Sequence, residues 1–250
     1  MRLVPRRLRF RAAIALSRMV APVVRRTGVY REQRGQCVDG LAEISLYRVL
    51  ESLGASGTLY DPVIRTEGME HLEAAVRSGE GVLLAGPHTM LSTLVVRLVR
   101  DRGWEQTVLS ASPMLVSGTR EVMPYLAPSP IFLVTVRRLL LRGTLVSGML
   151  DRGELHDRRV IQFSTDRGTM AVADALIPLA VRCGARIVFL ATRVEGGEVV
   201  VRFAPPRPES VTAEEVTADF VAFVQSHVAA RAARSRRAPV VASAPEPVAG

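Results

Sequence analysis

The stretch that decides the fold runs Gly81-Val82-Leu83-Leu84-Ala85-Gly86-Pro87-His88-Thr89-Met90-Leu91-Ser92-Thr93-Leu94. An apolar run of strand length ends at Gly86-Pro87, and a helix-period pattern begins just beyond it. His88 is therefore expected at a strand-to-helix turn, where a side chain can face a cleft instead of the core. Histidine is the side chain that changes charge near neutral pH, so His88 is a candidate general base. Capping of the following helix is the alternative role.

On both sides of this stretch, apolar segments of strand length alternate with segments of helical period. The alternation predicts an α/β domain with a mostly parallel central sheet flanked by helices. Strands are expected at 63–67, 81–86, 107–111, 144–150 and 160–163, with a hairpin formed by 187–194 and 199–203. Helices are expected at 42–53, 69–78, 89–102, 136–142, 169–182 and 211–234, the last with a capping box of Thr212 and Glu215.

The chain is strongly basic, with a net charge of +9 over 250 residues, and all 33 of its basic residues are arginine. This charge favours an anionic partner: a phospholipid surface, an acidic carrier protein, CoA or nucleic acid. Aromatic residues make up only 5% and are not interleaved with the basic ones, so nucleic-acid binding is not predicted. The two cysteines, Cys37 and Cys183, do not form a disulfide framework and fit a reducing cytoplasm. No pattern of metal ligands appears, and we expect no cofactor.

Residues 1–35 form a predicted basic amphipathic helix that ends or kinks near Pro22. Its arginines at 7, 11, 18 and 25 fall in one stripe, with apolar residues between them. Arg11 and Arg18 interrupt the apolar run, so the segment is too short to cross a bilayer. It is expected either to lie on a membrane surface or to pack its apolar face on its own domain. That domain is expected to span 36–234, before a disordered tail at 235–250.

Ligands of parallel sheets gather at the carboxyl ends of the strands. His88 and Asp151 each follow such an end, and the polar turn 164–168 follows a third and leads into a predicted helix N-terminus, where anions bind. Within that turn, Ser164, Arg167 and Gly168 are candidate substrate-binding residues, and the backbone N–H groups of 164–169 are candidate oxyanion donors. The basic cluster of Arg137, Arg138 and Arg142 is a further candidate, for a phosphate or a carrier's phosphopantetheine arm; a solvated helix face is the alternative.

Several blocks between about residues 60 and 230 occur in an order that resembles the lysophospholipid acyltransferase superfamily. The resemblance is closest to the branch that adds late acyl chains to lipid A and related bacterial glycolipids. The matching blocks are Arg65-Thr66-Glu67-Gly68-Met69-Glu70-His71-Leu72, the strand from Gly81 to His88, the segment 143–151 that ends in Asp151, the segment 180–190 with Gly184-Ala185, and the hairpin that ends in Pro205-Pro206.

This resemblance implies that His88 removes a proton from the acceptor. In the family an acidic residue five positions after the histidine orients the imidazole, but here that position is Thr93. Three explanations are open. Asp151 or Asp166 replaces the acid from another loop; or Thr93, with Ser92, suffices for a more reactive donor or acceptor; or acyl transfer has been lost and binding retained.

The resemblance thus leads us to expect an acyltransferase that moves an acyl group from acyl-CoA or acyl carrier protein to a hydroxyl or amine, without an acyl-enzyme. The alternative is a non-catalytic protein on the same scaffold that binds lipid or a carrier protein. The basic N-terminal helix predicts a cytoplasmic protein held peripherally on the inner face of the plasma membrane.

Overall fold

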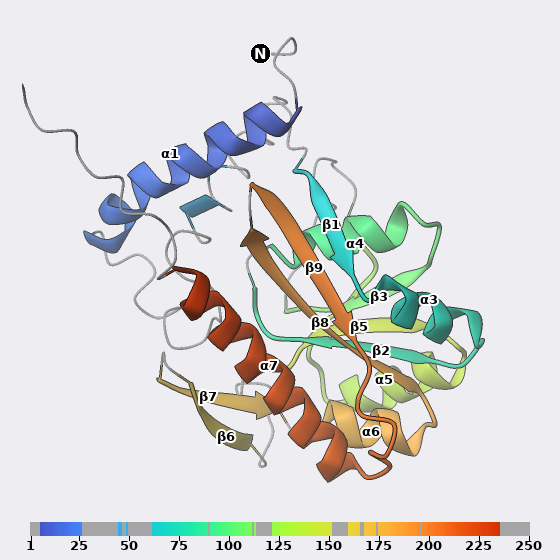
Figure 1. Ribbon diagram of the computed structural model, residues 1–250. Coiled ribbons are helices and arrows are strands. Elements are labelled where there is room, and N and C mark those ends of the chain that lie inside the picture. Colours follow the sequence, from blue (N-terminus) through green and yellow to red (C-terminus); the bar gives the residue numbers. More distant parts are fainter. Residues whose placement is uncertain are drawn as a thin grey trace, which may run out of the picture.

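The structure is a computed structural model that describes residues 6–26, 45–46, 49, 62–89, 91–111, 113, 122–151, 160–165, 168–173, 175–195 and 197–235. Within these residues, seven strands form one sheet, and every neighbouring pair except β8–β9 is parallel (Figure 1). This confirms the α/β fold with a mostly parallel central sheet. The strand order is β1 (Ile64–Glu67), β9 (Glu198–Ala204), β8 (Arg186–Glu195), β2 (Val82–Gly86), β5 (Leu145–Met149), β3 (Gln106–Leu109) and β4 (Tyr125–Leu126).

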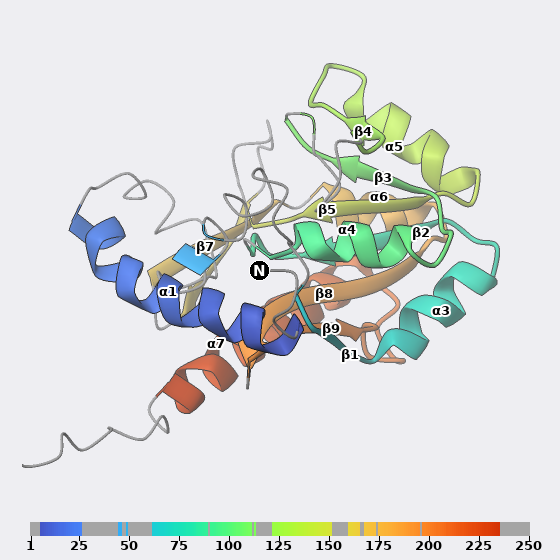
Figure 2. The same ribbon diagram turned by 90° about the horizontal axis from the view of Figure 1, so that it is seen from above.

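Helices cover both faces of the sheet (Figure 2). One face packs against α5 (Phe132–Leu141), α6 (Leu176–Arg182) and α7 (Ala213–Ser235). The other face packs against α1 (Arg6–Arg26), α3 (Met69–Arg77) and α4 (Thr93–Arg100). A central strand must bury both of its faces, which explains why its sequence is continuously apolar and does not alternate. In β2, for example, Leu83 lies in the first core and Leu84 in the second.

The N-terminal helix is part of this three-layer arrangement. Phe10 and Ala13 of α1 are buried in the same core as α3 and α4. At the turn between β8 and β9, Gly197 has a φ of +88°, and a side chain there would meet Arg11 of α1. The helix continues through Pro22 to Arg26, so Pro22 does not end it.

Most elements lie where the sequence predicts them, including the β8–β9 hairpin and α3. The capping box of α7 is also confirmed. The backbone N–H of Glu215 donates to Thr212 Oγ1 at 3.2 Å, and the backbone N–H of Thr212 donates to Glu215 Oε2 at 2.9 Å. Parts of the predicted helix 42–53, and residues 236–250 of the predicted tail, lie outside the described residues.

The predicted helix 169–182 is wrong in its first half. Residues Gly168–Ala173 form β7, which pairs antiparallel with β6 (Val160–Thr165), and α6 begins only at Leu176. Pro178 explains the later start, because proline is tolerated in the first turn of a helix but not in its interior. The predicted helix 89–102 likewise begins later, at Thr93.

Candidate active site

The parallel pairing of β2 with β5 brings His88 and Asp151 together. The two strands are in register up to Gly86 and Met149, and the N–H of Leu150 donates to the carbonyl oxygen of Gly86 at 2.9 Å. His88 and Asp151 each lie two residues beyond that last pair. They stand at the carboxyl edge of the sheet, by which we mean the edge where β2, β3, β4 and β5 end.

Asp151 holds His88 through two contacts to one carboxylate oxygen. Asp151 Oδ1 lies 2.5 Å from His88 Nδ1 and accepts the backbone N–H of His88 at 2.7 Å. A carboxylate only accepts hydrogen bonds, so Nδ1 carries the proton and the lone pair resides on Nε2. The Asp151 side chain is 0% exposed, whereas that of His88 is 28% exposed. Asp151 therefore holds the imidazole ring from the buried side, while part of the ring is exposed to solvent, as a general base requires.

The second oxygen of the carboxylate, Asp151 Oδ2, is buried and has no hydrogen-bond partner within the described part of the chain. Burial of a carboxylate is tolerated when it is paired with a hydrogen-bonding group of complementary charge. His88 provides this pairing through the contact of its Nδ1 with the other carboxylate oxygen, Oδ1.

The His88 turn is also held from the β8 side, by a contact that the sequence pattern does not predict. Thr192 of β8 donates its hydroxyl to the hydroxyl of Thr89 at 2.6 Å, and both side chains are buried. Gly86 lies so close to β8 that a Cβ there would sit 2.7 Å from the carbonyl oxygen of Leu190. No local signal identifies Thr192, because the two threonines are 103 residues apart.

Thr93, at the position where the family that the sequence resembles has an acid, is the first residue of α4; its side chain lies outside what the structure describes. Ser92 precedes it and makes no side-chain cap to the helix. Asp151, one of the two candidate acids, follows a neighbouring strand and contacts the histidine. Asp166, the other candidate acid, lies outside the described residues.

The predicted anion site at residues 164–168 does not have the expected geometry. Ser164 and Gly168 belong to the β6–β7 hairpin, where Ser164 pairs with Thr169 and Gly168 with Thr165. The segment leads into a strand, so there is no helix N-terminus at 169 to bind an anion. This corrects the expectation that backbone N–H groups there act as the start of a helix. Arg167 lies outside the described residues.

The arginine cluster on α5 is not brought to His88. Arg137, Arg138 and Arg142 are all exposed, and Arg142 follows α5 just before β5 begins. Asp151 follows the opposite end of β5, a strand whose five residues span roughly 16 Å. Arg142 therefore lies at the edge of the sheet away from the site.

A network of charged side chains ties β1 to β8 beside the site. Arg193, one residue after Thr192, donates to both carboxylate oxygens of Glu67 at 3.0 Å. Arg65 also donates to Glu67, at 2.8 Å. Burial raises the pKa of Glu67, but the hydrogen bonds and positive charges of Arg193 and Arg65 outweigh it and hold the pKa below its usual value. The network therefore links β8 to β1, from which it is separated by β9 in the sheet.

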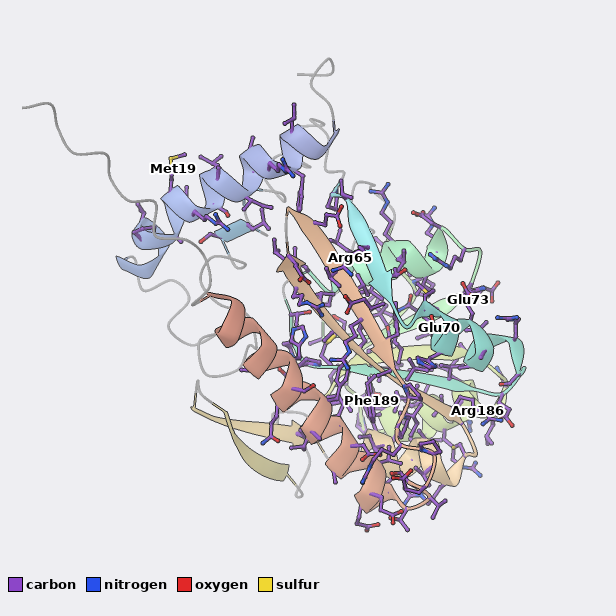
Figure 3. All side chains as sticks on the ribbon, viewed as in Figure 1. Met19, Arg65, Glu70, Glu73, Arg186 and Phe189 are labelled. Atoms are coloured by element: carbon purple, nitrogen blue, oxygen red, sulfur yellow. The ribbon has the colours of Figure 1, made fainter. Side chains whose placement is uncertain are left out.

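Helix α1 has two different faces. Phe10, Ala13 and Ser17 are buried against the domain, whereas Leu16 and Met19 point to the opposite side and are exposed, Met19 by 68%. Figure 3 shows Met19 projecting away from the rest of the molecule. Among the described residues, no helix has the length and apolar character required to cross a membrane, and no group of metal-ligating side chains is found there either.

No protein-family model matches the chain, and no curated protein matches it in sequence.

Proposed function

We propose that this protein is an acyltransferase that moves an acyl group from a thioester donor, acyl-CoA or acyl carrier protein, to a hydroxyl or amine. The observation that carries the proposal is the contact between the buried carboxylate of Asp151 and Nδ1 of the partly exposed His88. The resemblance of the sequence blocks to lysophospholipid acyltransferases supports the same reaction class.

In the proposed reaction His88 Nε2 accepts the proton of the acceptor's hydroxyl or amine as that atom attacks the thioester carbonyl. The tetrahedral intermediate then collapses, the C–S bond breaks, and the departing thiolate takes the proton from the imidazolium. The proton therefore passes from acceptor to thiol, and no acyl-enzyme forms. Asp151 fixes the tautomer of His88 and stabilises its cation, the role of the orienting carboxylate in a hydrolase triad.

The contact of Asp151 with His88 supports the proposal at the point where the sequence departs from the family pattern. The family pattern requires an acid five residues after the histidine, in the helix that follows. In this chain the acid would come from the neighbouring strand end, so the absence of a carboxylate at Thr93 would not deprive His88 of its orienting group. A charged partner matters here because stabilisation of developing charge contributes several kcal/mol in such sites.

We further propose that the protein works in the cytoplasm, held peripherally on the inner face of the plasma membrane through α1. The helix contains seven arginines and no acidic residue, which suits an anionic lipid surface. Its packing beside α3 and α4 puts it on the face of the sheet to which Val82 and Leu84 of β2, the strand that precedes His88, belong.

The test is acyl transfer from a panel of acyl-CoA and acyl-carrier-protein donors to hydroxyl and amine acceptors, followed by mass spectrometry of the intact products. His88→Ala should lower turnover by a factor of roughly a hundred or more, with an unchanged melting temperature. His71→Ala is the matched control, because His71 is an exposed histidine on α3. Full transfer by a folded His88→Ala variant would refute the mechanism. Donor binding without transfer by the wild type would favour the non-catalytic alternative.

A further inference from the structure

The exposed apolar side chains are concentrated in two places. Eleven large hydrophobic residues of the described chain are exposed, and only Val211 lies outside these two places. Four belong to α1. The other six form a surface over β4 and α5, which we call the β4–α5 surface: Val122, Tyr125, Ile131, Leu133, Val134 and Leu141. Exposed apolar residues that gather on one surface, unlike those scattered singly, point to an interaction site.

The outer face of α5 combines apolar and positively charged side chains. Val134, Arg137, Arg138 and Leu141 are spaced three to four residues apart, so they share one face of the helix. All four are exposed, while Val136, on the inner face, is completely buried. From 122 to 142 the chain contains three arginines and no aspartate or glutamate. The surface therefore presents apolar and positively charged side chains together, with no acidic residue in this stretch of the sequence.

We propose that the β4–α5 surface is the docking site of an acidic protein, and that this protein is the acyl carrier that brings the donor. The proposal rests on the proposed acyl transfer and selects between the two donors. An acidic partner complements the arginines, whereas a second copy of this chain in a two-fold contact would set arginine against arginine. The arginines project from a convex helix, which suits a protein surface better than the enclosed phosphate site that CoA requires.

An anionic membrane is the other possible partner of a basic surface, and the proposed membrane contact is made by α1. α1 and α5 pack on opposite faces of the sheet, and Figures 1 and 2 both show the two helices far apart. The β4–α5 surface would then face the solvent, where a soluble protein can reach it.

The position of the surface also suits delivery of a tethered acyl chain. β4 is parallel to β3, and β3 to β5, so β4 ends at the same carboxyl edge as the strands that carry His88 and Asp151. β4 is three strands from β2, which corresponds to roughly 14 Å across the sheet. α5 begins shortly after β4, at Phe132. Only β4 and the start of α5 lie at the carboxyl edge, whereas Leu141 lies toward the opposite edge, so the flexible arm of a bound carrier would have to reach His88 from the β4 end of the surface.

The test compares two double variants of equal charge. Arg137→Gln with Arg138→Gln removes two charges from the surface, and Arg77→Gln with Arg102→Gln removes two charges from the α3–α4 side of the molecule. We expect the first variant to lower kcat/KM at least tenfold with an acyl-carrier-protein donor and to leave kcat/KM with acyl-CoA unchanged. The second should change neither. Equal losses with both donors, or equal losses in both variants, would overturn the proposal.

Direct binding separates this proposal from the proposed function. Titration of holo acyl carrier protein into the full-length chain should give a salt-sensitive affinity that falls in the Arg137→Gln/Arg138→Gln variant and in Val134→Ser. If binding follows this pattern and no acyl transfer occurs, the docking site stands and the enzyme assignment fails. If acyl transfer proceeds from carrier protein equally well in all variants, the function stands and the docking site fails. Loss of binding to anionic vesicles, instead of to the carrier, would reassign the surface to the membrane.

Discussion

His88 and Asp151 stand at the same level of two neighbouring parallel strands, each two residues beyond the last paired residues of β2 and β5. The register of the sheet therefore sets the contact between the carboxylate and the imidazole, without help from a local motif. The position of an acid five residues after the histidine would be set by the geometry of one helix. The position of an acid at the end of the next strand is set by the register of the sheet, whose strands form both hydrophobic cores.

Asp151→Asn should leave the fold intact and lower kcat much more than it raises KM. The amide can still accept a hydrogen bond from Nδ1, but it supplies no charge to stabilise the imidazolium and can favour the wrong tautomer. Because the two residues act as a unit, the double variant His88→Ala/Asp151→Asn should be no slower than His88→Ala alone. Steady-state kinetics of the three variants test this. Additive losses would mean that Asp151 does not act through His88.

The hydroxyl pair of Thr89 and Thr192 predicts a second effect on the same turn. Thr192→Val keeps the shape of the side chain but leaves the Thr89 hydroxyl buried without this partner, which should lower the free energy of unfolding by about 1–2 kcal/mol. If the pair positions His88, kcat should fall while KM stays the same, and Thr192→Ser should restore both activity and stability. A variant that loses stability and retains its full kcat would limit Thr192 to a structural role.

The sequence predicts the elements well because the two periodicities are clear, from the apolar run of β2 to the capping box of α7. It also places His88 and Asp151 at strand ends. It does not state that β2 and β5 are neighbours, and that adjacency is what turns two separate residues into a pair. The error at residues 169–175 has a local cause, since Thr169, Met170 and Val172 fit a helical apolar pattern as well as a strand. Pro178 was the available signal for the true start of α6.

Asp219 on α7 gives a prediction for acid stability. It accepts hydrogen bonds from the hydroxyl of Ser210 and from the backbone and side chain of Arg207. Burial raises the pKa of Asp219, but these hydrogen bonds and the charge of Arg207 outweigh it and hold the pKa below the ordinary 3.8. A lowered pKa in the folded state stabilises the protein above the unfolded-state pKa, and this contribution disappears as the pH falls through the folded-state pKa.

Asp219→Asn should therefore destabilise the protein by about 1.5–3 kcal/mol near neutral pH and by progressively less below about pH 4. Urea denaturation of both proteins between about pH 7 and about pH 3 measures the difference. Glu70→Gln is a suitable control, because Glu70 is an exposed carboxylate with 73% of its side chain accessible. A difference that is independent of pH would show that Asp219 is held by something other than its charge.

The two faces of α1 decide how the proposed membrane contact should be tested. Deletion of residues 1–26 is the simplest experiment, but it would also remove Phe10 and Ala13 from the core and is expected to cause aggregation. Substitution of the outer face avoids this. Leu16→Ser with Met19→Ser should leave the melting temperature unchanged and reduce co-sedimentation with anionic phosphatidylglycerol vesicles, since both side chains are exposed. Val211→Ser, which changes an exposed apolar residue elsewhere, is the control and should bind normally.

Binding through α1 should also weaken with salt, because exposed charges are screened over about 10 Å at 0.1 M ionic strength. Arg18→Gln should reduce this salt dependence, since Arg18 is exposed beside the apolar face of the helix. Neutral phosphatidylcholine vesicles should bind less than anionic ones, as the seven arginines of α1 have no anionic headgroups to pair with there. If the wild-type protein binds neither kind of vesicle, or if the outer-face variant binds as well as the wild type, α1 serves only to complete the core and the proposed peripheral location is wrong.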